Sequence, residues 1–278
     1  MGIHAGHQVA ACRLRFIVCR YPAASLTRTL LALAAVFVAL SLVCSDDAGA
    51  GAPASDGGTV FGTGLEPVGC TSTAGKEARE GPHLRREVAL TFDDGPSSVQ
   101  TPEILATLES LGAEATFFEE GRHVGGREAL MREILAAGDE IGNHSYHHPK
   151  YPGNAEIAST DRRIHAATGF EPCLFRPPYG LVDGTVAAAA RRNKLEMVLW
   201  NLDAGDDHHD AAAAIQAHAV HRARPGSIIL MHDGGHHPQT PKALPGIIDG
   251  LRARGYSLVT VSTLLGGHML YRSGPGPG

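Results

Sequence analysis

From residue 87 onwards, short apolar runs alternate with longer stretches that place apolar side chains at helical spacing. The apolar runs predict strands at 88–92, 114–118, 139–142, 173–176, 195–202, 226–231 and 256–261. The stretches between them predict helices at 102–111, 127–137, 155–168, 183–193, 210–222 and 240–253. Glycines follow four of these helices where a helix should end, at Gly112, Gly138, Gly169 and Gly255.

Alternating strands and helices favour a parallel sheet with helical crossovers. About seven such units close most naturally into a barrel with outer helices. A doubly wound open sheet is the alternative, but no G-x-G-x-x-G sequence follows the first strand, which argues against a dinucleotide-binding fold. In both architectures ligands bind at the carboxyl ends of the strands.

The first fifty residues lie outside this pattern and predict a secretory leader at 1–50. Arg20 and Arg28 precede an apolar run at 30–43, which is shorter than the roughly twenty residues of a membrane-spanning helix. Ala48-Gly49-Ala50 then supplies small residues for cleavage. We expect a secreted, extracellular or cell-wall-associated protein that meets the membrane only transiently, through the leader. An uncleaved N-terminal anchor is the alternative.

The five cysteines divide between the leader and the rest of the chain. Cys44 is a poor site for lipid modification because the bulky Val43 precedes it. Beyond the leader only Cys70 and Cys173 are left, and two cysteines of an exported protein can form a disulfide. The sequence leaves open whether they meet. No C-x-x-C pair occurs, which excludes a cysteine-based zinc site.

Composition fits one sizeable globular core, since 43% of the 278 residues are hydrophobic and 19% are charged. Net charge is −5, and no basic run is interleaved with aromatic residues, so we expect no nucleic-acid partner. Residues 51–86 are rich in small and turn-forming residues and predict a flexible linker. The folded part is expected at 87–265, followed by a disordered tail at 266–278.

Chemically versatile side chains follow the predicted strands, each just past a carboxyl end. They are Asp93 and Asp94, His144 and His148, Arg176 and Tyr179, Asp203 and Asp206, and His232 and Asp233. Because these ends meet at one edge of a parallel sheet, the shared position predicts an active site there.

Asp93 and Asp94 are adjacent carboxylates at the end of an apolar strand, where repulsion and desolvation are unfavourable unless a cation is bound. His144 and His148 are four residues apart, and on a helical turn both imidazoles would face one ion. Two histidines and one carboxylate leave coordination positions open, as in catalytic metal sites. A solvated histidine pair is the alternative. Five other histidines are interpreted as loop residues: His147, His208, His209, His236 and His237.

The ordered motifs TFDDG, HSYHH, RPPY, D-A-G-D and LMH resemble those of the polysaccharide deacetylases of carbohydrate esterase family four, the NodB-homology domain. The resemblance covers residues 88 to 265, essentially the whole folded part. It implies a distorted (β/α) barrel. It also implies metal-dependent hydrolysis of N-acetyl, or sometimes O-acetyl, groups on a glycan.

The resemblance also assigns roles. It makes Asp93 the general base and His232 the general acid. Arg176 would contact the base, and Asp206 would pair with the acid. The metal ligands would be Asp94, His144 and His148. The backbone N–H of Tyr179 would bind the oxyanion, Leu230 would line the acetyl pocket, and Pro177 belongs to this substrate and oxyanion group.

The implied cofactor is one divalent ion, with Zn²⁺ favoured and Co²⁺, Ni²⁺ or Mn²⁺ as alternatives. Non-haem iron is disfavoured, because such oxygenases usually have all-β folds. The implied partner is an acetylated polysaccharide or oligosaccharide, with N-acetylglucosamine residues of peptidoglycan or chitin-type oligomers preferred. Alternatives are O-deacetylation of acetylated xylan and a non-catalytic glycan-binding pseudo-deacetylase.

The sequence departs from the family pattern at Asp207, where these deacetylases usually have tryptophan. An acidic residue removes a stacking surface near the acetyl group and adds negative charge. The only tryptophan, Trp200, is expected to lie on the preceding strand and to pack in the core.

Overall fold

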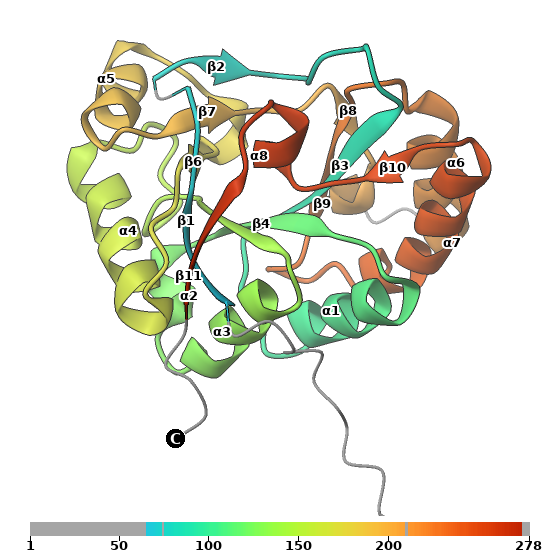
Figure 1. Ribbon diagram of the computed structural model, residues 1–278, viewed down its shortest axis with the longest axis horizontal. Coiled ribbons are helices and arrows are strands. Elements are labelled where there is room, and N and C mark those ends of the chain that lie inside the picture. Colours follow the sequence, from blue (N-terminus) through green and yellow to red (C-terminus); the bar gives the residue numbers. More distant parts are fainter. Residues whose placement is uncertain (1–64, 74, 209–210, 274–278) are drawn as a thin grey trace, which may run out of the picture. The chain divides into compact units, whose positions relative to one another are not determined.

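The computed structural model describes residues 65–73, 75–208 and 211–273 (Figure 1). Nine strands form one sheet in which every neighbouring pair is parallel. They are β2 (Glu77–Ala78), β3 (Glu87–Asp93), β4 (Ala115–Glu119), β5 (Glu140–Asn143), β6 (Leu174–Phe175), β7 (Glu196–Val198), β8 (Leu202–Asp203), β9 (Ile228–His232) and β10 (Ser257–Leu258). The order is β2-β7-β6-β5-β4-β3-β9-β8, with β10 attached to β3.

Helices surround this sheet, and Figure 1 shows α1, α3, α4, α5, α6 and α7 around its periphery. The helices are α1 (Gln100–Leu111), α2 (Gly121–Val124), α3 (Glu128–Ala136), α4 (Asn154–Thr168), α5 (Gly184–Arg192), α6 (Ala212–Arg222), α7 (Thr240–Ala253) and α8 (Val261–Leu264). Two short 3₁₀ helices, η1 (Pro178–Gly180) and η2 (Asp206–His208), follow strand ends. None of the helices in the described ranges has the length and apolar character needed to cross a membrane.

The sheet curls into a distorted barrel, as predicted. β7 lies next to one end of the strand order and β8 lies at the other, yet only residues 199–201 separate them in the chain. A connection this short reaches at most about 15 Å, so the two edges of the sheet must face each other.

The prediction of one continuous strand at 195–202 is wrong, because β7 and β8 are separate strands in different parts of the sheet. Side chains take up the hydrogen-bonding groups between them. The Leu199 carbonyl accepts from Arg176 Nη2, and Asn201 Oδ1 accepts from the Ile228 N–H at 3.0 Å. Leu199 still donates its N–H to the Ala78 carbonyl of β2 at 2.8 Å, and the chain then crosses the gap in the barrel held largely by side chains.

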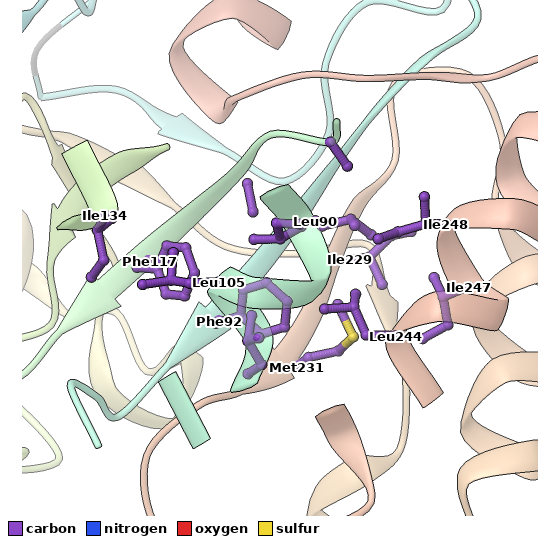
Figure 2. Close-up of a cluster of buried hydrophobic side chains, with 14 of the residues drawn as sticks. Leu90, Phe92, Leu105, Phe117, Ile134, Ile229, Met231, Leu244, Ile247 and Ile248 are labelled. Atoms are coloured by element: carbon purple, nitrogen blue, oxygen red, sulfur yellow. The ribbon is translucent and has the colours of Figure 1, made fainter. Parts of the chain in front are cut away.

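Successive side chains of β3 point alternately towards the inside of the barrel and towards the outer layer of helices. Leu90 and Phe92 point outward into the main cluster against the helices, where Phe92 stacks on Phe117 at 5.1 Å (Figure 2). Ala89 belongs to the separate inner cluster, and Asp93, four residues on, has the same orientation. The strand thus directs its last carboxylate into the mouth of the barrel while its apolar face anchors it.

The predicted linker and tail both contain structure. β1 (Leu65–Cys70) lies within the predicted linker, β11 (Met269–Ser273) lies within the predicted tail, and the two pair antiparallel. A disulfide joins Cys70 to Cys173 just before β6. The predicted leader at 1–50 lies outside the described residues.

The helix α8 covers the amino-terminal end of the strands. Glu140 at the start of β5 is fully buried, and its Oε2 accepts from the Ser262 N–H at 3.0 Å and from the Thr116 hydroxyl at 3.1 Å. This end of the barrel is closed, which leaves the opposite end, where the predicted site residues gather.

Candidate active site

Asp93 is a buried carboxylate held by a buried guanidinium. Arg176 Nη1 donates to Asp93 Oδ1 at 2.7 Å and to the Thr91 hydroxyl at 2.8 Å, while its Nε donates to the Val198 carbonyl. The Arg176 side chain also lies over the Phe118 ring, at 4.1 Å from its centroid. These contacts fix the orientation of Asp93 and leave its Oδ2 directed away from Arg176.

Asp94 faces two imidazoles. Its Oδ1 lies 3.3 Å from Nε2 of His144 and 3.3 Å from Nε2 of His148, and this buried oxygen has no hydrogen-bond partner in the described ranges. Burial alone would raise the pKa of Asp94, but the two histidines lower it below its usual value. A buried, ionised oxygen opposite two ring nitrogens fits the donor set of a divalent cation such as zinc.

Hydrogen bonding determines which nitrogen of His144 is available to an ion. Its Nδ1 lies 2.8 Å from the Arg176 carbonyl, which can only accept, so Nδ1 carries the proton and Nε2 faces Asp94. Burial and the charge of His144 lower the pKa of His148 to about 4. Its imidazole is therefore neutral at physiological pH, as a metal ligand must be.

The turn that carries these histidines is not helical, which corrects the predicted geometry. Ser145 and His148 have left-handed backbones, with φ of 65° and 59°. The two imidazoles nevertheless converge, with ring centroids 4.9 Å apart. The turn is stabilised by Asn143, whose Oδ1 accepts from the Ser145 N–H at 2.7 Å and whose Nδ2 donates to Asp161 on α4.

Glu156 in the first turn of α4 holds the same segment from the other side. Its Oε2 accepts from the backbone N–H groups of Tyr146, at 3.1 Å, and His147, at 2.8 Å. Its Oε1 lies 2.9 Å from His147 Nδ1. His147, interpreted from the sequence as an ordinary loop residue, therefore helps to fix the turn that carries His144 and His148.

His232 and Asp206 form a second polar pair, on the neighbouring strand. His232 is the register partner of Asp93, so both side chains point into the barrel mouth. Asp206 Oδ1 lies 2.9 Å from His232 Nδ1, and its Oδ2 accepts from the His232 N–H and from the Thr240 hydroxyl. Burial alone would lower the pKa of His232, but Asp206 raises it to about 9.

The remaining predicted site residues line the same mouth. Tyr179 has a left-handed backbone, with φ of 58°, and its ring packs edge-on against His148 at 4.5 Å. Its backbone N–H donates no hydrogen bond to the part of the chain that the structure describes. Pro177 is buried beside it, and Leu230 is buried on β9 two residues before His232. All ten predicted site residues therefore belong to adjoining elements at one end of the barrel.

Asp207 is exposed at this rim. Its carboxylate lies close to those of Asp203 and Asp206 and 3.6 Å from His208 Nδ1. Trp200 differs from its predicted position, since it lies between β7 and β8 and is only partly buried. It packs beside Gly180, and its ring centroid is 5.7 Å from the Arg176 guanidinium.

Sequence reasoning missed one buried carboxyl behind the site, Glu119, and one histidine within it, His237; it placed Asp233 at the strand end but did not predict its burial. Glu119 ends β4 with both carboxyl oxygens buried and without hydrogen-bond partners in the described ranges. Asp233 follows His232, is fully buried and accepts from the Thr101 hydroxyl. Burial raises the pKa of both, that of Asp233 to about 7. His237 stacks on His232 with ring centroids 4.8 Å apart.

Known proteins share both the sequence and the fold. A family model described as polysaccharide deacetylase matches residues 80–198. A peptidoglycan-N-acetylglucosamine deacetylase of Bacillus cereus is 37% identical over 210 residues, covering 72% of this chain and 95% of that protein. A bifunctional xylanase/xylan deacetylase of Cellvibrio japonicus is 36% identical over 174 residues, covering 60% of this chain and 26% of that protein.

A solved structure of the Bc1960 peptidoglycan N-acetylglucosamine deacetylase matches with a TM-score of 0.66 and 31% identity, covering 69% of this chain and 94% of that one. The likeness therefore spans the barrel and its catalytic end.

Proposed function

Because the chain belongs to the polysaccharide deacetylases of carbohydrate esterase family four, we propose that it hydrolyses acetyl groups of a glycan with a divalent metal ion, acting on N-acetylglucosamine residues. One observation carries this proposal. Asp94 faces two imidazole nitrogens at 3.3 Å each, while its neighbour Asp93 is held by Arg176 instead. A set of metal-ligand side chains and a separate proton acceptor thus lie next to each other.

Asp93 is the general base of the proposal. Arg176 occupies its Oδ1, and its Oδ2 lies 3.8 Å from His144 Nε2, on the side of the metal ligands. A water molecule there can give its proton to Oδ2 as it attacks the acetyl carbon. Because Arg176 is itself buried and held by four acceptors, the carboxylate keeps its orientation without any rearrangement.

His232 is the general acid. Asp206 binds its Nδ1 and keeps the imidazole protonated near neutral pH, so Nε2–H is available to the departing amine. The backbone N–H of Tyr179 is suited to bind the developing oxyanion, and buried Leu230 provides apolar contact for the acetyl methyl.

Asp94, His144 and His148 would hold the metal ion. When bound, the ion supplies positive charge that polarises the acetyl carbonyl and lowers the pKa of a water. Zinc is the proposed ion, since two neutral imidazoles and one carboxylate with open positions match its catalytic sites.

N-acetylglucosamine in peptidoglycan or chitin-type oligomers is the proposed substrate, supported by the printed activity of the Bacillus cereus relative. Export to the cell exterior or the cell wall belongs to the same proposal. It is supported by the leader-like sequence at 1–50 and by the disulfide, which is typical of oxidising compartments.

Acetate release tests the proposal directly. The protein is incubated with N-acetylglucosamine oligomers, peptidoglycan and acetylated xylan, and the products are identified by mass spectrometry. We expect N-deacetylated products that disappear with a chelator and return with Zn²⁺. The variant His148→Gln should lose most of both bound metal and activity. Xylan-only activity would select O-deacetylation, and glycan binding without acetate release would select a pseudo-deacetylase.

A further inference from the structure

His237 adds an imidazole to the catalytic end that the proposed mechanism does not use. It lies on the loop between β9 and α7, is half-buried, and stacks on His232 with ring centroids 4.8 Å apart and planes 26° apart. In this loop, Gly235 has φ of 64°, a backbone conformation that glycine adopts without strain.

Both histidine rings are anchored on the same residue, Asp206. His232 Nδ1 lies 2.9 Å from Asp206 Oδ1, and His237 Nδ1 lies 3.3 Å from the Asp206 carbonyl oxygen. One ligand atom from each of the three residues lies within 4.8 Å of the other two. This is a second His-His-Asp group, separate in its residues from the group around Asp94.

The surroundings of this group favour a cation. The carboxylates of Asp203 and Asp207 lie within 4.8 Å of that of Asp206, so three acidic side chains meet beside the two imidazoles. Asp207, the departure from the family pattern, contributes one of these charges. Imidazole nitrogen and carboxylate oxygen together suit a borderline-soft divalent ion such as zinc.

We propose that Asp206, His232 and His237 form a second Zn²⁺ site, and that its occupation inhibits the enzyme. The ion takes the place of the proton between His232 Nδ1 and Asp206 Oδ1, and this proton leaves to solvent. Those two atoms are 2.9 Å apart, close to the roughly 3 Å between neighbouring ligand atoms of a zinc ion. The His237 loop supplies the third ligand.

Inhibition follows from the identity of the ligands. With zinc on Nδ1, Nε2–H is the last ring proton of His232, and its release would leave an anionic imidazolate. His232 is then too weak an acid to protonate the departing amine, so deacetylation stops while the first metal site stays filled. This inhibitory effect rests on the proposed function, whereas binding of the second ion does not.

Metal stoichiometry tests the site itself. The protein is dialysed against increasing free Zn²⁺, and bound zinc per chain is measured by mass spectrometry. We expect two ions in the wild type and one in His237→Gln. The matched control is His236→Gln, which removes the exposed neighbouring histidine and should still bind two. His237→Asn repeats the test if the glutamine variant does not fold, as judged by circular dichroism.

Activity tests the consequence. Acetate release by the wild type should peak at one equivalent of zinc and fall as the second ion binds. In His237→Gln the inhibitory zinc concentration should rise at least tenfold. A single zinc in the wild type, or two in His237→Gln, would overturn the site. Unchanged inhibition in His237→Gln would overturn the inhibitory role. If no substrate is deacetylated, the proposed function fails, and the stoichiometry still decides the site.

Discussion

Asp93 and Asp94 are neighbours in the chain, yet their carboxylates have different partners. Asp94 has a left-handed backbone, with φ of 72°, a conformation in which aspartate is enriched among residues other than glycine. Gly234 packs so closely against this turn that a Cβ there would lie 1.9 Å from the Asp94 carbonyl oxygen. The turn thus sends one carboxylate to Arg176 and the other to the histidines.

The substitution Asp93→Asn separates orientation from proton transfer. The new amide oxygen would still accept a hydrogen bond from Arg176, but the side chain would take no proton from water. We expect kcat to fall by about 10²–10⁴ while bound metal stays the same. Acetate release and metal content measured on one sample check this. The control is Asp249→Asn on the exposed face of α7, and equal turnover in both variants would remove Asp93 from the mechanism.

The substitution Asp206→Asn should move the alkaline limit of activity. His232 works in its protonated form, and Asp206 holds its pKa at about 9, above its ordinary value. Without that charge the proton is lost at lower pH, so the fall of kcat at alkaline pH should begin at least one pH unit earlier. Complete kcat–pH profiles of both proteins test this, with Asp207→Asn as the control. If kcat fell at the same alkaline pH in the wild type and in Asp206→Asn, this prediction would be wrong.

Sequence motifs named the polar residues of the mouth but not those behind it. Glu119 lies in the run FFEEG, where a second acidic residue follows, and nothing local shows that its side chain is fully buried. His237 lies among polar loop residues, and its stacking on His232 depends on how that loop folds back. Both positions follow from tertiary packing, which spacing along the chain does not encode.

At the level of elements, the strand register places the two proton-transfer groups together. β3 and β9 pair in parallel, so Asp93 and His232 occupy the same level on adjacent strands. Short apolar runs predicted both strands, and the rule that ligands bind at the carboxyl ends of strands predicted their site residues. The separation of β7 from β8 was not predictable in this way, because it depends on which strands they pair with and not on their own apolar content.

The turn after β5 shows how one spacing fits two conformations. Four residues between His144 and His148 suit a helical turn, and the prediction assumed one. The observed turn brings the rings together through left-handed residues instead. Glu156, on the following helix, accepts from the backbone N–H groups of Tyr146 and His147 and so holds this turn.

The buried carboxyl of Asp139, which lies at the starts of β4 and β5, predicts how the stability of the protein depends on pH. Its Oδ1 accepts from the Ala115 N–H at 2.7 Å, and burial raises its pKa to about 8. The folded protein therefore holds a proton that the unfolded chain releases above about pH 4. The stabilisation gained from holding this proton is complete below about pH 4 and is lost as the pH rises towards 8.

The substitution Asp139→Asn removes this titration. Between pH 5 and pH 8 the wild type should lose ~1–3 kcal/mol more of its unfolding free energy than the variant does. Urea unfolding at both pH values measures the difference. Parallel losses in the two proteins would show that Asp139 does not titrate in this range.

For the whole molecule, the barrel was predictable and the pairing of β1 with β11 was not. The sequence of β1, LEPVGC, has no clear alternation, and its partner β11 comes at the far end of the chain. Neither segment has a sheet-like pattern of its own. Their pairing and the disulfide make them part of the fold.

The disulfide should make a large contribution to stability. Cys70 and Cys173 are 103 residues apart in sequence, so linking them restricts the unfolded chain strongly. The double variant Cys70→Ser/Cys173→Ser should lose roughly 2–5 kcal/mol of unfolding free energy. Urea unfolding with and without dithiothreitol checks this, because the reductant should destabilise the wild type only. The folded variant should keep its turnover, since the bond lies away from the catalytic end.

The β1–β11 ribbon lies near the amino-terminal ends of the strands, where β1 forms a bridge to Glu171 ahead of β6. Leu65 and Ser273 are paired at one end of this ribbon, so the chain enters and leaves the barrel at neighbouring points. Coupling the protein to a bead at Leu65 or at Ser273 would therefore leave the catalytic rim turned outward. An enzyme immobilised in this way should process an insoluble polymer as readily as a dissolved one.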